Sequence, residues 1–383
     1  MYWVQGHSDL AAKIFNGGAG TSEEKLQVML RAIPGRRNEN GQRFFAWPEE
    51  ILVDQNRQVV GYLMPRVDGV SLWDIILPNR REKKQPRLDR KGLYQIGIHL
   101  SKAVEVLHGE GHAANDLQPQ NVLVTRKGVV LIDCDSFEVL DQTNNRVFVC
   151  PVGLAKYIPP EYQGMSVPDY RGGEKVDRFA LAVLLFQLLM QGGHPFSGVY
   201  QDDENRQLGG RIADGVWPYA PSTQAKRPPR NPPLKVLPPV LRQHFRQCFM
   251  EGHRIPSKRP EPGRWRHLLE QVRPALQRCQ GGHYFGPHLS KCPWCGNRAE
   301  SQNGSPGSGH WLDKYRSRGL LQRAAAKTRN WFRRLTTTHT QNRNSHRSKT
   351  GLNFRAAGNS LLGAGSSIDE SQKLASTQAL VSG

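Results

Sequence analysis

The first part of the chain carries short apolar runs that have the length of β-strands. They are Leu10–Phe15, Ile51–Val53 and Val59–Met64. The polar residues between the last two runs, Asp54–Arg57, are typical of a turn, so these two runs predict a β-hairpin. The pattern therefore predicts a small antiparallel sheet within residues 1–67.

Helical periodicity replaces this pattern further along the chain. Over residues 93–107, apolar residues recur every three or four positions, at Leu93, Ile96, Leu100, Val104 and Leu107. Residues 179–190 are apolar almost without interruption, which is typical of a helix that is buried on all sides. Residues 78–91 are rich in Lys and Arg, and we interpret them as a solvated loop rather than a nucleic-acid surface. Strands precede helices, as in an α+β protein.

Positive charge is concentrated near the C-terminus. The 383-residue chain has a formal net charge of +20, and residues 297–383 supply half of it, with 14 Lys and Arg against 4 Asp and Glu. Residues 336–350 contain no aliphatic or aromatic side chain, so we expect residues 298–383 to form a basic, largely disordered tail. Residues 311–335 mix Trp, Leu and Phe with basic residues. Two interpretations stay open for them: contact with nucleic acid or an anionic membrane, and a weakly ordered linker.

Two further features of the sequence bear on the cellular compartment. The longest apolar run, residues 179–190, is shorter than the roughly 20 residues that cross a bilayer, and the N-terminus lacks a signal-peptide pattern. Three of the 6 cysteines fall within the 17 residues 279–295, which favours a metal site over a disulfide framework. We therefore expect a cytoplasmic protein without a transmembrane segment.

One segment carries the polar residues that phosphate chemistry needs. Asp116 is followed by Asn121, and Asp133 comes directly after the apolar residues Leu131 and Ile132. Phosphoryl transfer requires a carboxylate that takes the proton of the attacking hydroxyl, and hard oxygen ligands that hold Mg²⁺. Asp116 fits the first task, and Asn121 and Asp133 fit the second.

This order of residues resembles the protein kinase family, and further segments extend the resemblance. Gly153–Glu161 is similar to the end of a kinase activation segment, and Asp177–Phe186 with Gly193–Phe196 is similar to the buried central helix and its exit. Arg259 corresponds to the kinase arginine that pairs with the glutamate at position 161.

The resemblance implies a bilobal α+β fold, with an N-terminal lobe over residues 1–67 and a helical C-terminal lobe over residues 68–275. It implies ATP and Mg²⁺ as cofactors and Ser or Thr hydroxyls of a protein substrate as acceptors. Lys13 corresponds to the catalytic lysine that binds the α- and β-phosphates, and Glu24 is its predicted helix partner, with Glu23 as an alternative. Residues 62–67, including Met64, are the predicted hinge that meets adenine.

Several segments resemble a narrower bacterial branch of kinase-like proteins: Ala46–Pro48, Ile132–Phe137, Pro151–Gly153, Tyr157–Tyr162 and Cys292–Cys295. Its members join a kinase-like domain to a small metal module or a helix-hairpin-helix module. Some are associated with a von Willebrand A protein and a metal-dependent phosphatase in stress or tellurium-resistance loci. The similarity covers about residues 2–297 and implies the same partners here.

The sequence also departs from the kinase pattern. The first strand and the glycine-rich loop expected before the phosphate-binding lysine are missing from residues 1–12. Ala114-Asn115 replaces the usual His-Arg, and Gln118 replaces a lysine that normally faces the γ-phosphate. Asp135 adds a carboxylate, either as a second metal ligand or in a structural role, which we favour. These departures define an alternative function, a catalytically weak pseudokinase scaffold that binds partners through its zinc module and basic tail.

A second candidate site lies in residues 276–297. It contains two close pairs of candidate metal ligands, Cys279 with His283 and Cys292 with Cys295. Two such pairs separated by a short hairpin are typical of a zinc ribbon, so we predict bound Zn²⁺, with His288 as an alternative fourth ligand. A dithiol redox site is the competing interpretation, but the residues after Cys295 lack the helix that such sites open.

Overall fold

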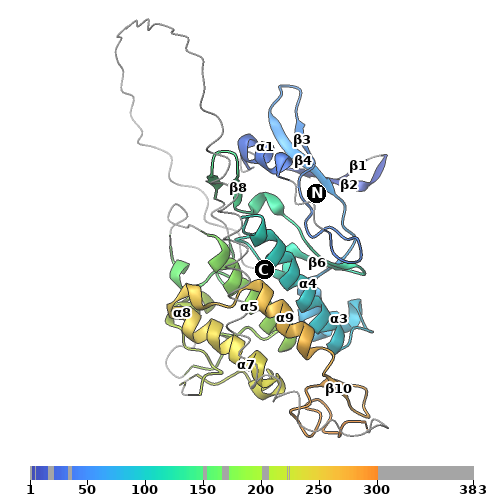
Figure 1. Ribbon diagram of the computed structural model, residues 1–383, viewed down its shortest axis with the longest axis vertical. Coiled ribbons are helices and arrows are strands. Elements are labelled where there is room, and N and C mark those ends of the chain that lie inside the picture. Colours follow the sequence, from blue (N-terminus) through green and yellow to red (C-terminus); the bar gives the residue numbers. More distant parts are fainter. Residues whose placement is uncertain are drawn as a thin grey trace, which may run out of the picture. The chain divides into compact units, whose positions relative to one another are not determined.

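The computed structural model describes residues 2–4, 6–15, 21–32, 37–149, 153–165, 172–200, 207–221, 223 and 225–300. Residues 301–383 of the predicted tail lie outside this part, and so do Pro151 and Val152. Residues 1–301 form one unit, in which the strands of the N-terminal part lie at one end of a helical body (Figure 1). The mixture of helices and sheets agrees with the predicted α+β class.

The N-terminal sheet has the strand order β1-β2-β4-β3, and each pair is antiparallel. Its strands are β1 (Tyr2–Val4), β2 (His7–Ile14), β3 (Glu50–Val53) and β4 (Val59–Pro65). The predicted hairpin is confirmed as β3 and β4. Helix α1 (Glu23–Arg31) follows β2, and the hydroxyl of Ser22 caps it by accepting a hydrogen bond from the Lys25 N–H. Its apolar side, with Leu26 and Met29, is buried in the core.

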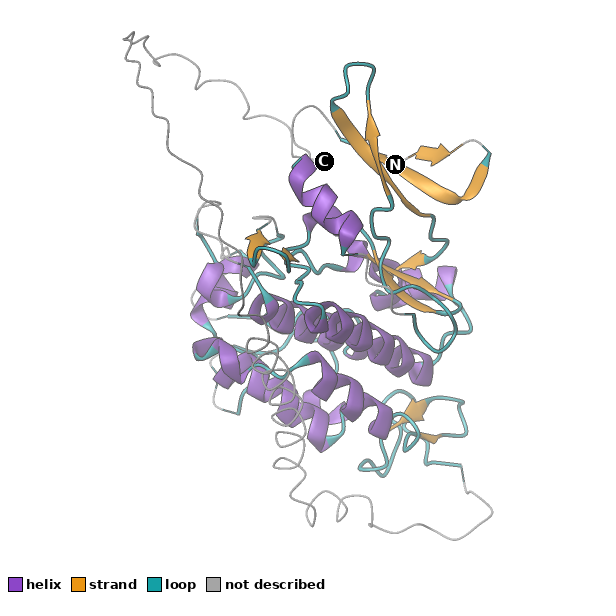
Figure 2. Ribbon diagram, turned by 45° about the horizontal axis from the view of Figure 1, so that its top comes forward, coloured by secondary structure: helices purple, strands orange, loops and turns teal. Residues whose placement is uncertain are grey.

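The helical body contains the two helices that periodicity predicts. They are α4 (Arg90–Gly109) and α5 (Glu174–Leu189). Around them lie α2 (Leu72–Ile76), α3 (Pro78–Lys84), α6 (Leu208–Asp214), α7 (Pro239–Arg246), α8 (Gly252–Arg254) and α9 (Pro262–Val272). Figure 2 shows the strands of the N-terminal sheet gathered apart from the long helices. Because α5 is buried nearly all round, it forms the centre of the C-terminal core.

Residues 78–84 correct one prediction. They form α3 rather than a loop, with Pro78 in the first turn. Pro is favoured there because its fixed φ suits the helix and its missing N–H would have no partner in the helix. No residue of α3 is buried, so the helix has no apolar stripe and periodicity cannot reveal it.

Three small β-sheets complete the described fold. β5 (Val70–Ser71), β6 (Val122–Thr125) and β7 (Gly128–Leu131) form one antiparallel sheet. β8 (Val139–Asp141) pairs with β9 (Arg146–Phe148), and β10 (Gln277–Arg278) pairs with β11 (Tyr284–Phe285). The antiparallel pairing of β6 with β7 sets the position of the candidate site, because β6 begins and β7 ends beside it.

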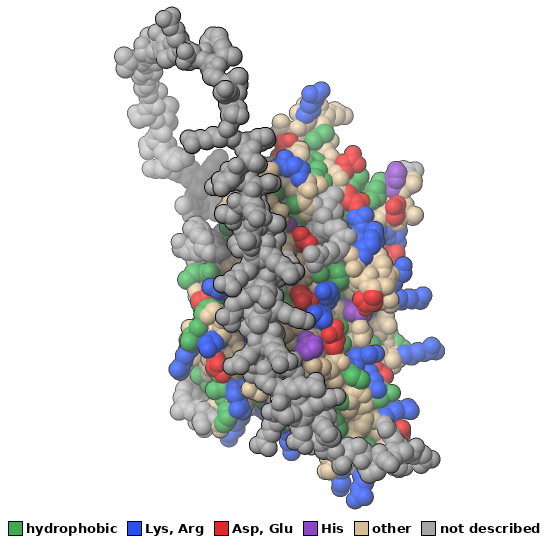
Figure 3. Space-filling model, viewed as in Figure 1, with side chains coloured by type: hydrophobic (Ala, Val, Ile, Leu, Met, Phe, Trp, Pro, Cys, Tyr) green, Lys and Arg blue, Asp and Glu red, His purple; other side chains and the backbone are tan. Residues whose placement is uncertain are grey.

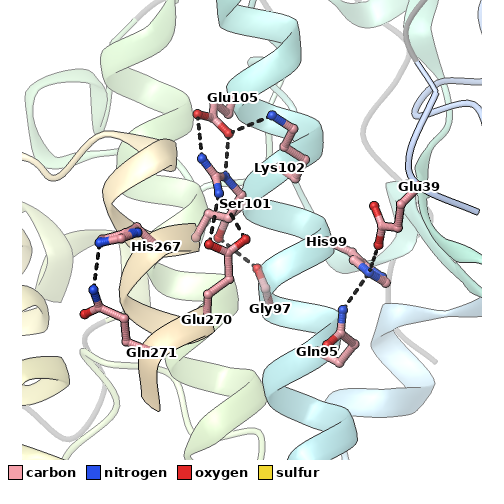
Figure 4. A network of polar contacts seen from close by, with 11 residues as sticks. Glu39, Gln95, Gly97, His99, Ser101, Lys102, Glu105, His267, Glu270 and Gln271 are labelled. Carbon is pink, nitrogen blue, oxygen red and sulfur yellow. Dashed lines mark hydrogen bonds and ion pairs between the residues drawn. The ribbon is translucent and has the colours of Figure 1, made fainter. Parts of the chain in front are cut away.

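The packing of α4 against α9 includes a network of polar contacts (Figure 4). Arg266 of α9 donates to Glu105 of α4 at 2.7 Å and to Glu270 on its own helix at 3.0 Å. The hydrogen bond to Glu105 is the main cause of a raised pKa of the Arg266 guanidinium. This network joins the first and last long helices of the body, so it serves the fold.

Charged side chains of both signs are interspersed on the face shown in Figure 3. This agrees with a mildly basic body, since the sequence places half of the net charge in the tail. Among the described residues, the structure contains no helix that is both long and apolar enough to cross a membrane.

Because of two buried histidines, we expect the free energy of unfolding to fall in acid. His112 stacks on Trp47 and accepts a hydrogen bond from the Leu140 N–H through Nδ1. His194 accepts from the Phe196 N–H through Nδ1, and its Nε2 lies 2.8 Å from the Lys156 carbonyl oxygen. Burial lowers the pKa of each imidazole from 6.5 to about 4.

Because the unfolded chain binds protons at higher pH than these imidazoles do, stability falls as the pH drops from 6.5 towards 4. Between pH 7 and pH 5 we expect each histidine to remove about 2 kcal/mol from the free energy of unfolding. Denaturant unfolding at both pH values measures the loss. His194→Gln should reduce the loss, whereas the exposed His267→Gln should leave it unchanged. Equal losses in wild type and His194→Gln would contradict the assignment.

Candidate active site

The loop between α4 and β6 brings Asp116 and Asn121 together. Asp116 Oδ2 accepts hydrogen bonds from Asn121 Nδ2 at 2.9 Å and from Gln118 Nε2 at 2.7 Å. Its other carboxylate oxygen, Oδ1, is buried and has no hydrogen-bond partner among the described residues. Burial raises the pKa of Asp116, while the bonds from Gln118 and Asn121 oppose the rise. The site therefore holds a carboxylate that two side-chain hydrogen bonds fix in place.

A buried aspartate on α5 holds the residues just before Asp116. Asp177 is fully buried, and its carboxylate accepts hydrogen bonds from the Ala114 N–H at 2.7 Å and the Asn115 N–H at 2.8 Å. His108 Nε2 lies 2.9 Å from the same carboxylate. Asn115 has φ of 56°, a left-handed conformation that a non-glycine residue adopts only when its surroundings hold it. Asp177 thus fixes the backbone that places Asp116.

The register of β6 and β7 places Asp133 beside Asn121. Val122 pairs with Leu131, and the Ile132 N–H donates to the Asn121 carbonyl oxygen at 2.9 Å. Asp133, the next residue, has the left-handed backbone angles φ 63° and ψ 40°, and its side chain is 39% exposed. The two predicted oxygen ligands therefore lie next to each other at the ends of adjacent strands, which fits a Mg²⁺ site.

Lys13 reaches this pair from β2. Its Nζ forms an ion pair with Asp133 and donates to Asp135 Oδ1 at 2.7 Å. Burial alone would lower the pKa of Lys13, but the neighbouring carboxylates of Asp135 and Asp133 outweigh it and raise the pKa. Lys13 is therefore held in its charged form at the mouth of the site.

The structure does not pair Glu24 with Lys13. Glu24 is exposed in the first turn of α1 and forms an ion pair with Arg146 of β9. Lys25 lies on the buried side of α1, just after the Ser22 cap. Its Nζ donates to the Asp135 carbonyl oxygen at 2.7 Å. Glu23 is exposed as well. The spacing along the helix thus brings a lysine, and not either glutamate, to the site.

An apolar cavity of about 250 Å³ lies next to these residues. Its lining combines β1, β2 and the end of β4 with the residue before Asp133: Tyr2, Trp3, Ala11, Ala46, Met64, Pro65, Arg66, Val67, Leu123 and Ile132. Met64 and the residues after it are those predicted as the hinge. An apolar cavity beside a lysine and two oxygen ligands suits a purine base attached to phosphates.

The predicted pair of Glu161 and Arg259 is confirmed. The fully buried Arg259 guanidinium donates to Glu161 Oε1 at 2.7 Å and to Oε2 at 2.5 Å. This bidentate contact holds the segment around Glu161 against the helical body, although the two residues are 98 positions apart in the sequence.

The four predicted zinc ligands converge near the C-terminal end of the described chain. The ligand atoms of Cys279, His283, Cys292 and Cys295 all lie within 4.8 Å of one another. Backbone turns bring each pair together: the Gly282 N–H donates to the Cys279 carbonyl oxygen, and the Gly296 N–H donates to that of Cys292. Gly282 and Gly296 have φ angles of 80° and 75°, which residues with a side chain rarely adopt.

His288 lies elsewhere. Its Nε2 is 3.0 Å from the Lys235 carbonyl oxygen, while His283 Nδ1 is 3.7 Å from the Cys279 sulfur. Among the described residues, the four-ligand cluster therefore contains His283 and not His288. Three thiols and one imidazole form a donor set that suits tetrahedral Zn²⁺.

Two residues at the site, Asp177 and Lys25, have no active-site role in the sequence-based predictions, and Tyr62 makes a contact there that its place in the predicted hinge does not include. Tyr62 Oη donates to Asp135 Oδ1 at 2.7 Å. An acidic residue just before the almost continuous apolar run 179–190 was the available signal for Asp177, since a buried charge needs partners. No comparable signal marks Lys25, because its partner Asp135 lies 110 positions away.

Comparisons with known proteins agree with this geometry. Residues 51–231 match the protein kinase domain family. The chain is 30% identical over 307 residues to protein kinase YegI of Escherichia coli (strain K12) and 33% identical to that of Escherichia coli O157:H7, covering 77% of this chain and 46% of each relative. It is 32% identical over 137 residues to the probable serine/threonine-protein kinase CPE1738 of Clostridium perfringens (strain 13 / Type A), covering 36% of this chain and 18% of that protein. The chain spans about half the length of the first two relatives, and these matches support a bacterial protein-kinase-like family.

Proposed function

We propose that this chain is a protein kinase-like phosphotransferase, which transfers the γ-phosphate of ATP to Ser or Thr hydroxyls of a protein. One observation carries the proposal: Lys13, Asp116, Asn121 and Asp133, which are scattered over 120 positions, meet beside one apolar cavity. A protein without phosphotransfer activity has no chemical need for a lysine, a positioned carboxylate and two oxygen ligands in one place.

Each residue has a task in the transfer. The apolar cavity receives the adenine, and Lys13 neutralises charge on the phosphates. Asp116 accepts the proton of the attacking hydroxyl, while Gln118 and Asn121 hold its carboxylate in place. Asn121 offers its side-chain oxygen to a metal, since its Nδ2 is engaged with Asp116.

Asn121 and Asp133 would hold a Mg²⁺ ion, which would supply positive charge that stabilises the phosphate oxygens. The donor set supports this assignment, because it consists of one amide oxygen and one carboxylate, both hard ligands. The partly exposed Asp133 side chain leaves the site open to a nucleotide.

The pseudokinase scaffold is the less favoured alternative. Gln118, which replaces a lysine, holds Asp116 by a hydrogen bond of 2.7 Å, so the replacement does not disorder the loop. The matches to the protein kinase domain and to serine/threonine-protein kinases also favour an enzyme.

Nucleotide binding tests this proposal before any substrate is known. Titration calorimetry of the full chain with Mg-ATP should show one site, and Lys13→Met should weaken binding about tenfold, because a charge-assisted contact is lost. The exposed Lys84→Met on α3 removes the same charge elsewhere and should bind as wild type does. Absence of binding in wild type, or equal loss in both variants, would contradict the proposal.

For the Cys/His cluster we propose a structural Zn²⁺ ion held by Cys279, His283, Cys292 and Cys295. The cluster has a small core of its own, with Phe285 and the buried cysteines, separate from the main core. Removing the metal should therefore loosen residues 276–297 and leave the kinase-like body folded.

Metal analysis under reducing conditions should find about one zinc per chain in wild type and His288→Ala, and far less in Cys292→Ser. His288→Ala is the matched control, since it removes a nearby imidazole that lies outside the cluster. A zinc-free wild type, or loss of zinc only in His288→Ala, would refute the four-ligand site.

The remaining expectations stay proposals that rest on the motifs alone. They are the lobe boundaries 1–67 and 68–275, the ribbon at 276–297, the cytoplasmic location with a role in stress response, and the von Willebrand A protein and metal-dependent phosphatase as partners. Residues 298–383 are proposed as a basic tail that contacts nucleic acid or anionic membrane. Affinity purification of the full chain, with mass spectrometry, tests the two protein partners together.

A further inference from the structure

We infer that Asp135, and not an acidic residue of α1, is the residue that positions Lys13 toward the nucleotide phosphates. This inference rests on the proposed phosphotransfer function. Protein kinases place this lysine with a glutamate from the helix that follows it. The contacts around Asp135 show a different arrangement in this chain.

Two donors on neighbouring strands converge on one oxygen of Asp135. Lys13 Nζ and Tyr62 Oη each donate to Asp135 Oδ1 at 2.7 Å. Lys13 and Tyr62 are cross-strand partners in the β2–β4 ladder, so the ladder holds both donors at a fixed separation. Tyr62 is fully buried and the Asp135 side chain is only 12% exposed, so water competes little for these bonds.

The backbone of Asp135 is fastened as well. Its carbonyl oxygen accepts hydrogen bonds from Lys25 Nζ at 2.7 Å and from Thr21 Oγ1 at 3.3 Å. Lys25 is buried in the first turn of α1, and Thr21 immediately precedes the helix cap. Helix α1 therefore acts on the site through the main chain of Asp135, and a change in its position changes the support of Lys13.

The acidic residues of α1 are directed elsewhere. Glu24 forms an ion pair with Arg146, and both side chains are more than half exposed. An exposed pair of this kind contributes little to positioning other groups. Asp135 thus takes the place that a helix glutamate has in other kinases, from a position two residues after the metal-binding Asp133.

This arrangement also separates the tasks of the two aspartates. Lys13 also forms an ion pair with Asp133, so the two aspartates share the lysine. Asp135 is the more buried of the two and also accepts from Tyr62, so we assign it the positioning role and not that of a second metal ligand. Asp133, with its more exposed carboxylate, remains the metal ligand of the strand.

Double-mutant cycles test the pairing without any need for activity. Thermal unfolding is measured for the full-length single variants Lys13→Met, Asp135→Asn and Glu24→Gln, and for Lys13→Met combined with each of the other two. Residues in contact show non-additive effects, whereas distant residues show additive ones. The fall in Tm for Lys13→Met with Asp135→Asn should differ from the sum of the single effects. The falls for Lys13→Met with Glu24→Gln should add. Additive behaviour for the Lys13 and Asp135 pair would overturn the inference.

Enzyme kinetics provide the second test of this inference. Asp135→Asn should raise the KM for ATP about tenfold, the size expected when a charged hydrogen bond is lost, and Asp135→Glu should restore part of the loss. Tyr62→Phe should have a smaller effect in the same direction, and Glu24→Gln should stay within about twofold of wild type. A loss in Glu24→Gln as large as in Asp135→Asn would overturn the inference, and so would a raised Mg²⁺ requirement in Asp135→Asn. If wild type transfers no phosphate, the proposed function fails, and the unfolding cycles still decide the role of Asp135.

Discussion

Asp116→Asn is expected to lower the rate of phosphate transfer about 10²–10⁴-fold, the usual contribution of a general base. The amide keeps the size of the side chain, so the contacts with Gln118 and Asn121 are disturbed least. An amide cannot take up the proton of the attacking hydroxyl as a carboxylate does. Because Asp116 does not contact the adenine cavity, the affinity for Mg-ATP should stay within about twofold of wild type.

Steady-state rates and calorimetric binding on the same preparation measure this separation. Asp74→Asn is a matched control, since Asp74 lies on α2 and pairs with Arg80 near the surface. Unchanged transfer in Asp116→Asn would remove Asp116 from the reaction. A loss of both transfer and ATP affinity would show that it supports the structure of the site instead.

Asp177→Ala is expected to have the largest effect on stability. It leaves the buried N–H groups of Ala114 and Asn115 without an acceptor, and it removes the partner of His108. Breaking a buried charged network by removing one member costs about 3–5 kcal/mol. Transfer should also be lost at temperatures where the variant is still folded, because the loop that carries Asp116 is no longer fixed.

Denaturant unfolding with a parallel activity assay checks both parts. The control is Glu174→Ala on the same helix, where a partly exposed ion pair with Arg178 contributes less than about 1 kcal/mol. If the two variants were equally stable, Asp177 would not be the support of the catalytic loop.

Local patterns in the sequence were enough to predict the helices and strands that bury an apolar face. The hairpin of β3 and β4 and the helices α4 and α5 follow from their apolar residues alone. Apolar periodicity does not predict helix α3, because none of its residues is buried. The pair of Glu161 and Arg259 was accessible only through the resemblance to kinases, since no local pattern joins residues 98 positions apart.

The support of Lys13 shows where such reasoning stops. Sequence spacing offers Glu24 and Glu23 as carboxylates for Lys13, and it does not say which side of α1 faces the site. That side is fixed by the burial of Leu26 and Met29 in the core, which turns Lys25 inward and Glu24 outward. In the same way, the choice of His283 over His288 depends on the turn at Gly282, a backbone feature that residue spacing does not contain.

Transfer of labelled γ-phosphate from ATP tests the central claim most directly. The full-length chain is incubated with labelled ATP, Mg²⁺ and a general protein acceptor such as casein, and is compared with Asp133→Ala. Wild type is predicted to label the acceptor or itself on Ser or Thr in a Mg²⁺-dependent reaction, and Asp133→Ala is predicted to lose this labelling because its metal ligand is gone. Equal labelling by the two proteins, or no labelling by wild type, would contradict the assignment as a phosphotransferase.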